Sequence, residues 1–297
     1  MAGFALSTAW HAPRVADARE LLALPARLGF AAVELSSIGS DLAQALQGLV
    51  RDGLPPVVSL HAPCPVPYPG AERLDDLAAL EEPRRLAAVG YTKESIDLAA
   101  ALGARVVVLH LGGVEGTVPQ RTVVQAMAAG PEGEWKRLLA DGLALRSAAR
   151  DRHLEQCLRS LEAIAAHAAG SGIRLGAETR YHYNDLPDVD EFQMILNAYG
   201  ARGVGYWHDT GHANTHETLG LTRPLEYLQR YGAHLVGVHL HDAVGTRDHL
   251  PPGEGEVNFA ALRPFLRPQH LRVFEVWSGH STERLAASLR VLQEAGV

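Results

Sequence analysis

The stretch Ile173-Arg174-Leu175-Gly176-Ala177-Glu178 decides the fold, because here a short β-rich run follows directly on a helical pattern. The helical pattern covers His153–Ala169 and stops at Gly170-Ser171-Gly172, and glycine is the residue that most often ends a helix. Strands that alternate with helices in this way are typical of βα units in a parallel sheet.

Seven further runs of this kind bring the number of predicted strands to eight. The runs are Phe4–Thr8, Ala32–Leu35, Val57–His61, Val106–Leu111, Ile173–Glu178, Val204–Asp209, Leu235–Leu240 and Val273–Val276. Helical patterns between them include Ala16–Leu28, Tyr91–Leu102 and Thr282–Ala295. Eight units predict one closed (β/α)₈ barrel over residues 1–297. A doubly wound open sheet is the alternative, and the lack of a GxGxxG motif after the first run weakens a dinucleotide-binding version of it.

Residues 112–150 depart from the repeat. They contain Gly112-Gly113, a helical pattern over Gln120–Ala129, the pair Gly130-Pro131 and a second helical pattern over Trp135–Ala149. We interpret this segment as an elongated loop after the fourth strand that carries one or two extra helices. Loops that follow barrel strands lie on the catalytic face. The insertion is therefore either a lid over the site or a packed excursion on the surface.

Composition narrows the class of protein. No stretch of 18 uncharged apolar residues occurs, so we expect no transmembrane helix. The net charge of −7 argues against a nucleic-acid partner, because phosphate binding usually needs a basic face. The two cysteines lie far apart and fit no zinc spacing, so a reduced cytoplasmic setting is the simplest expectation. The composition does not decide between a monomer and a homo-oligomer.

Ionisable side chains stand at the ends of most predicted strands. The motifs are Ser59-Leu60-His61, Val108-Leu109-His110, Ala177-Glu178-Thr179-Arg180, His208-Asp209-Thr210-Gly211-His212, Val238-His239-Leu240-His241 and Phe274-Glu275-Val276-Trp277. Barrel active sites form where the carboxyl ends of the strands meet. These side chains are therefore expected to converge on one mouth of the barrel.

Four of these residues favour a divalent metal ion. Glu178 and Glu275 each follow a hydrophobic run, where an unpaired carboxylate would be costly to bury. Together with Asp209 and His239 they give a hard, oxygen-rich ligand set that suits Mn²⁺, Mg²⁺ or Co²⁺ and does not exclude Zn²⁺. A structural salt bridge, for example between Glu178 and Arg180, is the alternative interpretation.

Further histidines leave the number of ions open. A second or third ion, which would favour Zn²⁺, could use His61, His110, His212 and His249. Singly, however, a histidine at a strand end is more often structural.

Residues two apart on a strand share a face, and this rule sorts the neighbours of the predicted ligands. His239 and His241 are such a pair, and we assign the deeper His239 to the ion and His241 to the substrate. Arg180 and Trp277 stand two residues after Glu178 and Glu275. Arg180 is predicted to bind a substrate oxygen or phosphate. Trp277 is predicted either to form an apolar wall for a sugar ring or to belong to the core.

With these motifs in place, the sequence resembles the xylose isomerase-like superfamily of TIM barrels, which includes sugar and sugar-phosphate isomerases and epimerases and the type IV apurinic endonucleases. The resemblance covers nearly the whole chain, from Ala32-Val33-Glu34-Leu35 to Phe274-Glu275-Val276. Its most specific pieces are Asp209-Thr210-Gly211-His212, His239-Leu240-His241-Asp242 and Pro252–Phe259. The last is similar to the family's GxGxxDF segment, with Asn258 where Asp is common.

For the epimerase branch, the resemblance implies metal ligands at Glu178, Asp209, His239 and Glu275, and substrate contacts at His212 and Arg247. Glu178 and Glu275 would be the acid/base pair on opposite faces of a substrate carbon, with an enediolate between the two proton transfers. A hydride shift is a variant of this chemistry.

For the endonuclease branch, the resemblance implies a trinuclear zinc cluster and phosphodiester hydrolysis. The matching histidines are present. The family's Asp-Arg-His, however, reads here as Arg247-Asp248-His249, which displaces the Asp. We therefore predict a sugar isomerase or epimerase that uses one divalent ion, with a phosphodiesterase as the alternative and a ligand-binding barrel without catalysis as a third class.

Overall fold

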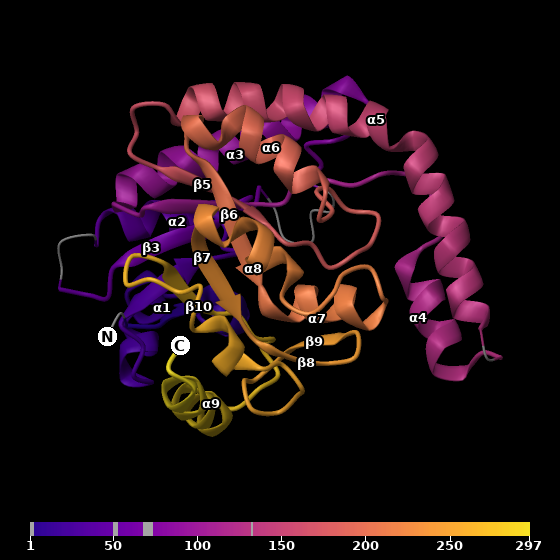
Figure 1. The fold of residues 1–297 in the computed structure, drawn as a ribbon. Coiled ribbons are helices and arrows are strands. Elements are labelled where there is room, and N and C mark those ends of the chain that lie inside the picture. The colour runs from indigo at the N-terminus through magenta and orange to yellow at the C-terminus, as the bar shows by residue number, and fades with distance from the viewer. Residues whose placement is uncertain (1–2, 50–52, 68–73, 132) are drawn as a thin grey trace.

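Eight parallel strands close into a barrel in the computed structural model, which describes residues 3–49, 53–67, 74–131 and 133–297. The pairing runs from β1 through β2, β3, β4, β5, β6 and β7 to β10, which pairs with β1 again (Figure 1). The strands are β1 (Ala5–Ser7), β2 (Ala32–Leu35), β3 (Val57–His61), β4 (Val106–Leu109), β5 (Arg174–Glu178), β6 (Val204–Asp209), β7 (Leu235–Leu240) and β10 (Leu271–Phe274). The predicted TIM barrel is confirmed.

Helices lie between the strands and cover the outside of the barrel (Figure 1). Their bounds are α1 (Ala18–Arg27), α2 (Ser40–Gln47), α3 (Glu82–Leu102), α4 (Gln120–Ala129), α5 (Glu134–Ala168), α6 (Glu191–Tyr199), α7 (Thr210–Thr218), α8 (Glu226–Tyr231) and α9 (Thr282–Ala295). A short antiparallel hairpin of β8 (Asp242–Val244) and β9 (Arg247–Leu250) follows β7. Among the described residues, no helix is both long and apolar enough to cross a membrane.

Some boundaries differ from those predicted. The last strand ends at Phe274, so Glu275 and Val276 follow it rather than belong to it. The fourth strand ends at Leu109, which places His110 just beyond the ladder. Helix α3 begins at Glu82, nine residues before the predicted start, with Pro83 in its first turn, where a missing N–H costs nothing.

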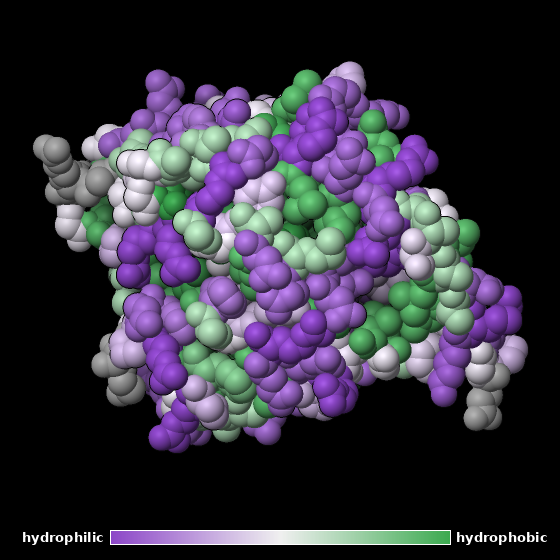
Figure 2. All heavy atoms as spheres, turned by 45° about the horizontal axis from the view of Figure 1, so that its top comes forward, coloured by the Kyte–Doolittle hydropathy of each residue, from purple (hydrophilic) through white to green (hydrophobic). Residues whose placement is uncertain are grey.

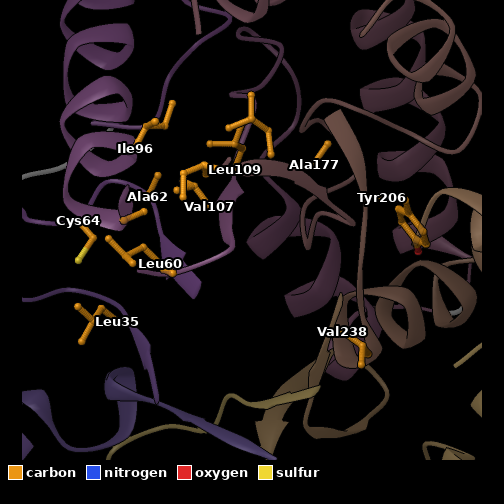
Figure 3. Packing of buried hydrophobic residues seen from close by; sticks show 14 of the residues in the cluster. Leu35, Leu60, Ala62, Cys64, Ile96, Val107, Leu109, Ala177, Tyr206 and Val238 are labelled. Atoms are coloured by element: carbon orange, nitrogen blue, oxygen red, sulfur yellow. The ribbon is translucent and has the colours of Figure 1, made fainter. Parts of the chain in front are cut away.

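Apolar side chains fill the space between the strands and the helices. Figure 3 shows part of this layer, in which Leu35, Leu60 and Val107 come from three neighbouring strands. A second cluster fills the barrel itself around the fully buried Trp207. Gly237 makes room for this indole, because a Cβ there would lie 2.2 Å from Trp207 Cζ3.

The insertion after β4 forms an arm of two helices that projects from one side of the barrel (Figure 1). Helix α4 has the predicted bounds, but the second helix does not stop near residue 149. Helix α5 instead runs unbroken from Glu134 to Ala168 and joins the arm to the barrel. Residues 143–168 contain neither glycine nor proline, so nothing ends the helix there.

The face of the molecule that is turned forward in Figure 2 carries mostly hydrophilic residues, and the hydrophobic residues on it lie in separate areas.

Ion pairs and close packing hold α5 against the loop between β5 and α6. The buried Arg146 donates to both carboxylate oxygens of Glu191 at 2.9 and 2.7 Å, and to Asp188 Oδ2 at 2.9 Å. Gly142 lies directly on Tyr183, where a Cβ would approach the phenol oxygen to 2.0 Å. The arm is therefore packed against the residues that follow β5.

Candidate metal centre

Four ionisable side chains meet at the carboxyl end of the barrel, from β5, β6, β7 and the residue after β10. One ligand atom from each of Glu178, Asp209, His239 and Glu275 lies within 4.8 Å of the others, and all four residues are buried. His239 Nδ1 is 2.5 Å from Glu178 Oε1, 3.0 Å from Glu275 Oε2 and 3.6 Å from Asp209 Oδ2. The structure thus brings together the four predicted ligands around one imidazole nitrogen.

A fourth carboxylate, from Glu34 on β2, contacts the other side of the same imidazole. Glu34 Oε1 lies 3.0 Å from His239 Nε2, and its second oxygen accepts a 2.8 Å hydrogen bond from Ser59 Oγ. With the Nε2 proton directed to Glu34, Nδ1 is the nitrogen left to face the carboxylates and an ion. Sequence reasoning did not include Glu34 in the site, although a carboxylate inside a buried four-residue strand was a usable signal.

The ionisation states follow from this crowding. Burial alone would lower the pKa of His239, but the carboxylates of Glu275, Glu34 and Glu178 raise it well above its usual range. Burial would likewise raise the pKa values of Glu178 and Glu275, yet the attraction of His239 holds both below their usual range. Without an ion, the imidazolium is therefore the cation that compensates these carboxylates.

The motif Asp209-Thr210-Gly211-His212 builds the start of α7 as well as the site. Asp209 Oδ1 accepts a 2.8 Å bond from the His212 amide and so caps the helix. Thr210 Oγ1 donates to the His241 carbonyl at 2.6 Å, which ties the helix to β7. Gly211 allows His241 to pack beneath it, because a Cβ there would lie 2.2 Å from the imidazole.

His61 and His110 form a second group on the far side of Glu178. Their Nε2 atoms lie 3.5 and 2.8 Å from Glu178 Oε2, and Arg180 Nη1 approaches the same oxygen to 3.2 Å. The Nδ1 of His110 is 2.6 Å from Asp75 Oδ2, a contact that the sequence did not predict. Although burial opposes it, Glu178 raises the pKa of His61 to about 9. With Glu178, the two histidines could hold a further ion.

A third group contains His212, His241 and His249, which also have the spacing to hold an ion. His212 Nε2 is 3.6 Å from Asp248 Oδ2, and His249 Nδ1 is 3.0 Å from the same oxygen. The Asp that the sequence places one position away from the family pattern therefore still reaches this group.

A cavity of about 560 Å³, called the catalytic cavity below, opens beside the carboxylates. Of the predicted substrate residues, it is lined by His61, His110, Arg180, His212 and Trp277, together with His249 and Glu275. Trp277 is 56% exposed and stacks on His249 with ring centroids 4.2 Å apart, as expected of a wall at the rim. Glu275 lines this cavity whereas Glu178 does not.

The structure does not bring two of the predicted substrate residues to this cavity. His241 is fully buried; its Nε2 lies 2.9 Å from Asp209, and its Nδ1 accepts a 2.8 Å bond from the His249 amide. It therefore contacts Asp209, a predicted metal ligand, and does not line the cavity. Arg247 is exposed on β9, whereas the next two residues, Asp248 and His249, both line the cavity, because His249 has a φ of +55° and the regular alternation of the strand does not hold there.

The segment Pro252–Phe259 is anchored on Asp242. This carboxylate accepts bonds from the backbone amides of Gly253 at 2.8 Å and Val257 at 3.0 Å. Asn258 caps the short helical turn that follows, by accepting from the Ala261 amide. Asn and Asp are equally good caps, so the departure from the family pattern at residue 258 preserves the local structure.

The fold and this site define a TIM barrel with a carboxylate-rich centre at its catalytic end. The chain matches the family model of the xylose isomerase-like TIM barrel over residues 22–295, and it belongs to this family.

Two relatives identified by sequence have no described function. The chain is 29% identical over 212 residues to the uncharacterized protein y4fM of Sinorhizobium fredii (strain NBRC 101917 / NGR234), which is 71% of this chain and 58% of that protein. It is 25% identical over 282 residues to the uncharacterized protein ML2432 of Mycobacterium leprae (strain TN), or 86% of this chain and 81% of that protein. The chain thus spans a little more than half the length of the first relative.

Two similar solved structures carry names of sugar epimerases. One is a D-tagatose 3-epimerase-like protein, with a TM-score of 0.71, 21% identity, and coverage of 99% of this chain and 96% of that chain. The other is the apo form of the 3-keto-D-glucoside 4-epimerase YcjR from E. coli, with a TM-score of 0.71, 17% identity, and coverage of 99% and 100%. At these identities the likeness shows the shared fold.

Proposed function

We propose that the chain is one catalytic domain that isomerises or epimerises a sugar, sugar phosphate or related polyol with the help of a divalent ion. The observation that carries the proposal is the set of three buried carboxylates around His239 Nδ1 at the mouth of the barrel. The names of the structural neighbours, which are sugar epimerases, support the substrate class.

The residues present fit a divalent cation. Three carboxylates and a fourth from Glu34 surround one imidazole in a buried site, and such an excess of negative charge is costly without a strong cation. Glu178, Asp209, His239 and Glu275 would hold the ion, and their oxygen-rich donor set suits Mn²⁺, Mg²⁺ or Co²⁺, with Zn²⁺ also compatible. The groups around His61 and around His212 would be the places for further ions.

When bound, the ion supplies Lewis-acid polarisation of the substrate carbonyl and stabilises negative charge on the substrate oxygens. Glu275 lines the catalytic cavity, so it is the base with direct access to a substrate proton. Glu178, which approaches the same Nδ1 of His239 as Glu275 does, completes the pair. Its Oε2 is held by His110 and Arg180, which both line the cavity.

Arg180 serves the substrate as well as Glu178 in this scheme. It lines the cavity and has more N–H donors than its pairs with Glu178 and Asp185 use, so it can also bind hydroxyl groups of a sugar, whereas both ring nitrogens of His110 already face carboxylates. Trp277 supplies an apolar face at the rim, on which the C–H face of a sugar can lie.

The test is exchange of deuterium from solvent at the substrate carbon by the metal-saturated variants Glu178→Gln and Glu275→Gln, with D-tagatose and D-fructose as first substrates. Each variant keeps the shape of the side chain but cannot accept a proton. We expect epimerisation to fall at least 10²-fold in both, which is the lower range of what a positioned acid or base contributes. One of the two should still wash label into the carbon that it can reach, because the other carboxylate is intact.

Near-wild-type turnover by both variants once metal is restored would show that the carboxylates are only ligands or salt-bridge partners. Glu20→Gln is a matched control, since Glu20 lies on the surface of α1, far in the sequence from the site residues, and pairs with Arg27.

A metal-dependent phosphodiesterase is the second candidate, and the additional histidine groups are the observation that favours it. The net charge of −7 argues for the small sugar substrate, because phosphate-backbone binding usually relies on a basic face.

A further inference from the structure

A second cavity, of about 690 Å³ and called the outer cavity below, lies next to the catalytic cavity. It is formed by the segment after β4 and the segment after β5. The first contributes residues 112–117 and 119–121, and the second contributes Arg180, His182, Asn184 and Asp185. Each cavity alone lies in the range of about 300–1,000 Å³ that is usual for small-molecule sites. The metal centre described above uses the catalytic cavity only.

The two cavities meet at shared residues. Asp75, Arg180 and His182 line both of them. Arg180 spans the border, because Nη1 lies 3.2 Å from Glu178 on the metal side and Nη2 lies 3.3 Å from Asp185 on the outer side. A molecule that extends from one cavity to the other would therefore pass this guanidinium.

The wall of the outer cavity is firmly built. The Val114 amide donates to the Asn184 carbonyl at 2.8 Å, and the Leu186 amide donates to the Gly112 carbonyl at 2.9 Å. Gly112 has a φ of +86°, and a Cβ there would lie 2.8 Å from the Ala78 nitrogen. These contacts lock the strand-following segments together, so the cavity is a preformed site and not a gap between mobile loops.

The charges in the wall select the kind of ligand. The carboxylates of Asp76 and Glu115 pair with Arg84, that of Asp185 pairs with Arg180, and that of Asp75 pairs with His110. Acidic groups thus outnumber the arginines that line the cavity, and no cluster of cations is present among the lining residues to hold a phosphate. Side chains such as Thr117, Gln120, Arg121 and Asn184 offer the donors and acceptors that hydroxyl groups require.

We propose that the outer cavity is the subsite for a second, neutral sugar unit, so that the substrate is a two-unit carbohydrate whose reacting unit lies at the metal centre. This inference rests on the proposed function and adds the size and charge of its substrate. The linking oxygen would lie beside Arg180, and the second unit would contact Arg121 and Asn184.

The test compares binding of one-unit and two-unit ketoses by calorimetry on the metal-loaded protein. The one-unit probes are D-fructose and D-tagatose. The two-unit probes are turanose, maltulose, lactulose and isomaltulose, which carry the second sugar on O3, on O4 (maltulose and lactulose) or on O6 of fructose. We expect the best two-unit probe to bind at least tenfold more tightly than either one-unit probe.

Two variants assign any preference to the outer cavity. Thr117→Trp places an indole in the space of the second unit, and Arg121→Ala removes its charged donor. Both should lower the ratio of two-unit to one-unit affinity, the first at least tenfold. Arg137→Ala is the matched control, because Arg137 is 65% exposed on α5, pairs with Asp141 and lines neither cavity. Its ratio should equal that of the wild type.

The outcomes separate the two ideas. Binding or turnover of one-unit ketoses with no gain for any two-unit probe would leave the proposed function intact and overturn the second subsite. A gain that persists in Thr117→Trp would also overturn it, because the second unit would then lie elsewhere. If no ketose of either size is bound or converted in the presence of Mn²⁺, Mg²⁺, Co²⁺ or Zn²⁺, both proposals are wrong.

Discussion

Glu34 offers a direct test of how the metal centre is organised, because it touches neither the catalytic cavity nor the predicted ion. Its carboxylate is fully buried and bonds to His239 Nε2 and Ser59 Oγ. The change Glu34→Ala removes both bonds at once. The Nε2 proton is then no longer fixed, and Nδ1 loses its defined role as the ligand nitrogen.

The expected magnitudes follow from these contacts. Loss of an outer partner of a metal-binding histidine typically costs about 10–100-fold in metal affinity, which is roughly 1.4–2.8 kcal/mol. The metal-free protein should lose stability too, because two buried groups become unpaired and each costs about 1–3 kcal/mol. Glu34→Gln keeps an oxygen that can accept from Nε2, so its metal affinity should fall less than tenfold.

The assay is a competition titration of the metal-free protein with Mn²⁺ or Zn²⁺ against a chelator, alongside urea unfolding. Glu20→Gln again serves as the surface control and should leave both quantities unchanged. Wild-type metal affinity in a folded Glu34→Ala variant would refute the idea that Glu34 orients His239.

Three further predictions concern the ion, the partner and pH. Exhaustive chelation should lower the melting temperature, since an ion at a hundredfold excess over its Kd contributes about 2.7 kcal/mol. Rebinding of the ion should release a proton from His239, whose pKa is raised in the metal-free site. An unchanged melting temperature and metal content would mean that these residues do not form a metal site. A duplex with an abasic analogue should be neither cleaved nor bound in a salt-sensitive way, and efficient incision at catalytic protein concentrations would reverse our ranking of functions. Burial, aided by the positive charge of His212, lowers the pKa of His216 to about 3. Between pH 6.5 and pH 3 the unfolded chain therefore takes up a proton at this residue and the folded protein does not. The contribution of His216 to stability is complete above pH 6.5 and declines as the pH falls from 6.5 towards 3. Unfolding free energies measured between pH 7 and pH 4 should therefore fall less steeply in His216→Phe, and identical slopes would contradict this assignment.

The strand pattern and the four central ligands were predictable for a physical reason. Barrel strands are buried on both faces and read as short apolar runs, so a carboxylate or imidazole at the end of a run stands out. Parallel strands then bring their ends together without any knowledge of loops. Glu178 and Asp209 are the last residues of their strands, His239 is the last but one of β7, and Glu275 follows its strand directly, so all four meet at one point.

The rest of the site depends on features that a strand pattern does not carry. The rule of alternating faces placed His241 beside His239, but β7 ends at Leu240 and the rule stops there. Asp75 reaches His110 from a segment between β3 and α3 that has no regular period. The outer cavity needs the packing of two loops against each other, and only the structure shows it.

The unbroken course of α5 also constrains how the arm can behave. At 1.5 Å per residue, its 35 residues form a helix roughly 50 Å long along its path, which turns between the arm and the barrel (Figure 1). The first part of the helix belongs to the arm, and the second part packs against the barrel. Moving the arm as a separate body would require several consecutive backbone hydrogen bonds to break in the middle of this helix. One continuous helix thus joins the arm to the barrel, in keeping with the preformed wall of the outer cavity.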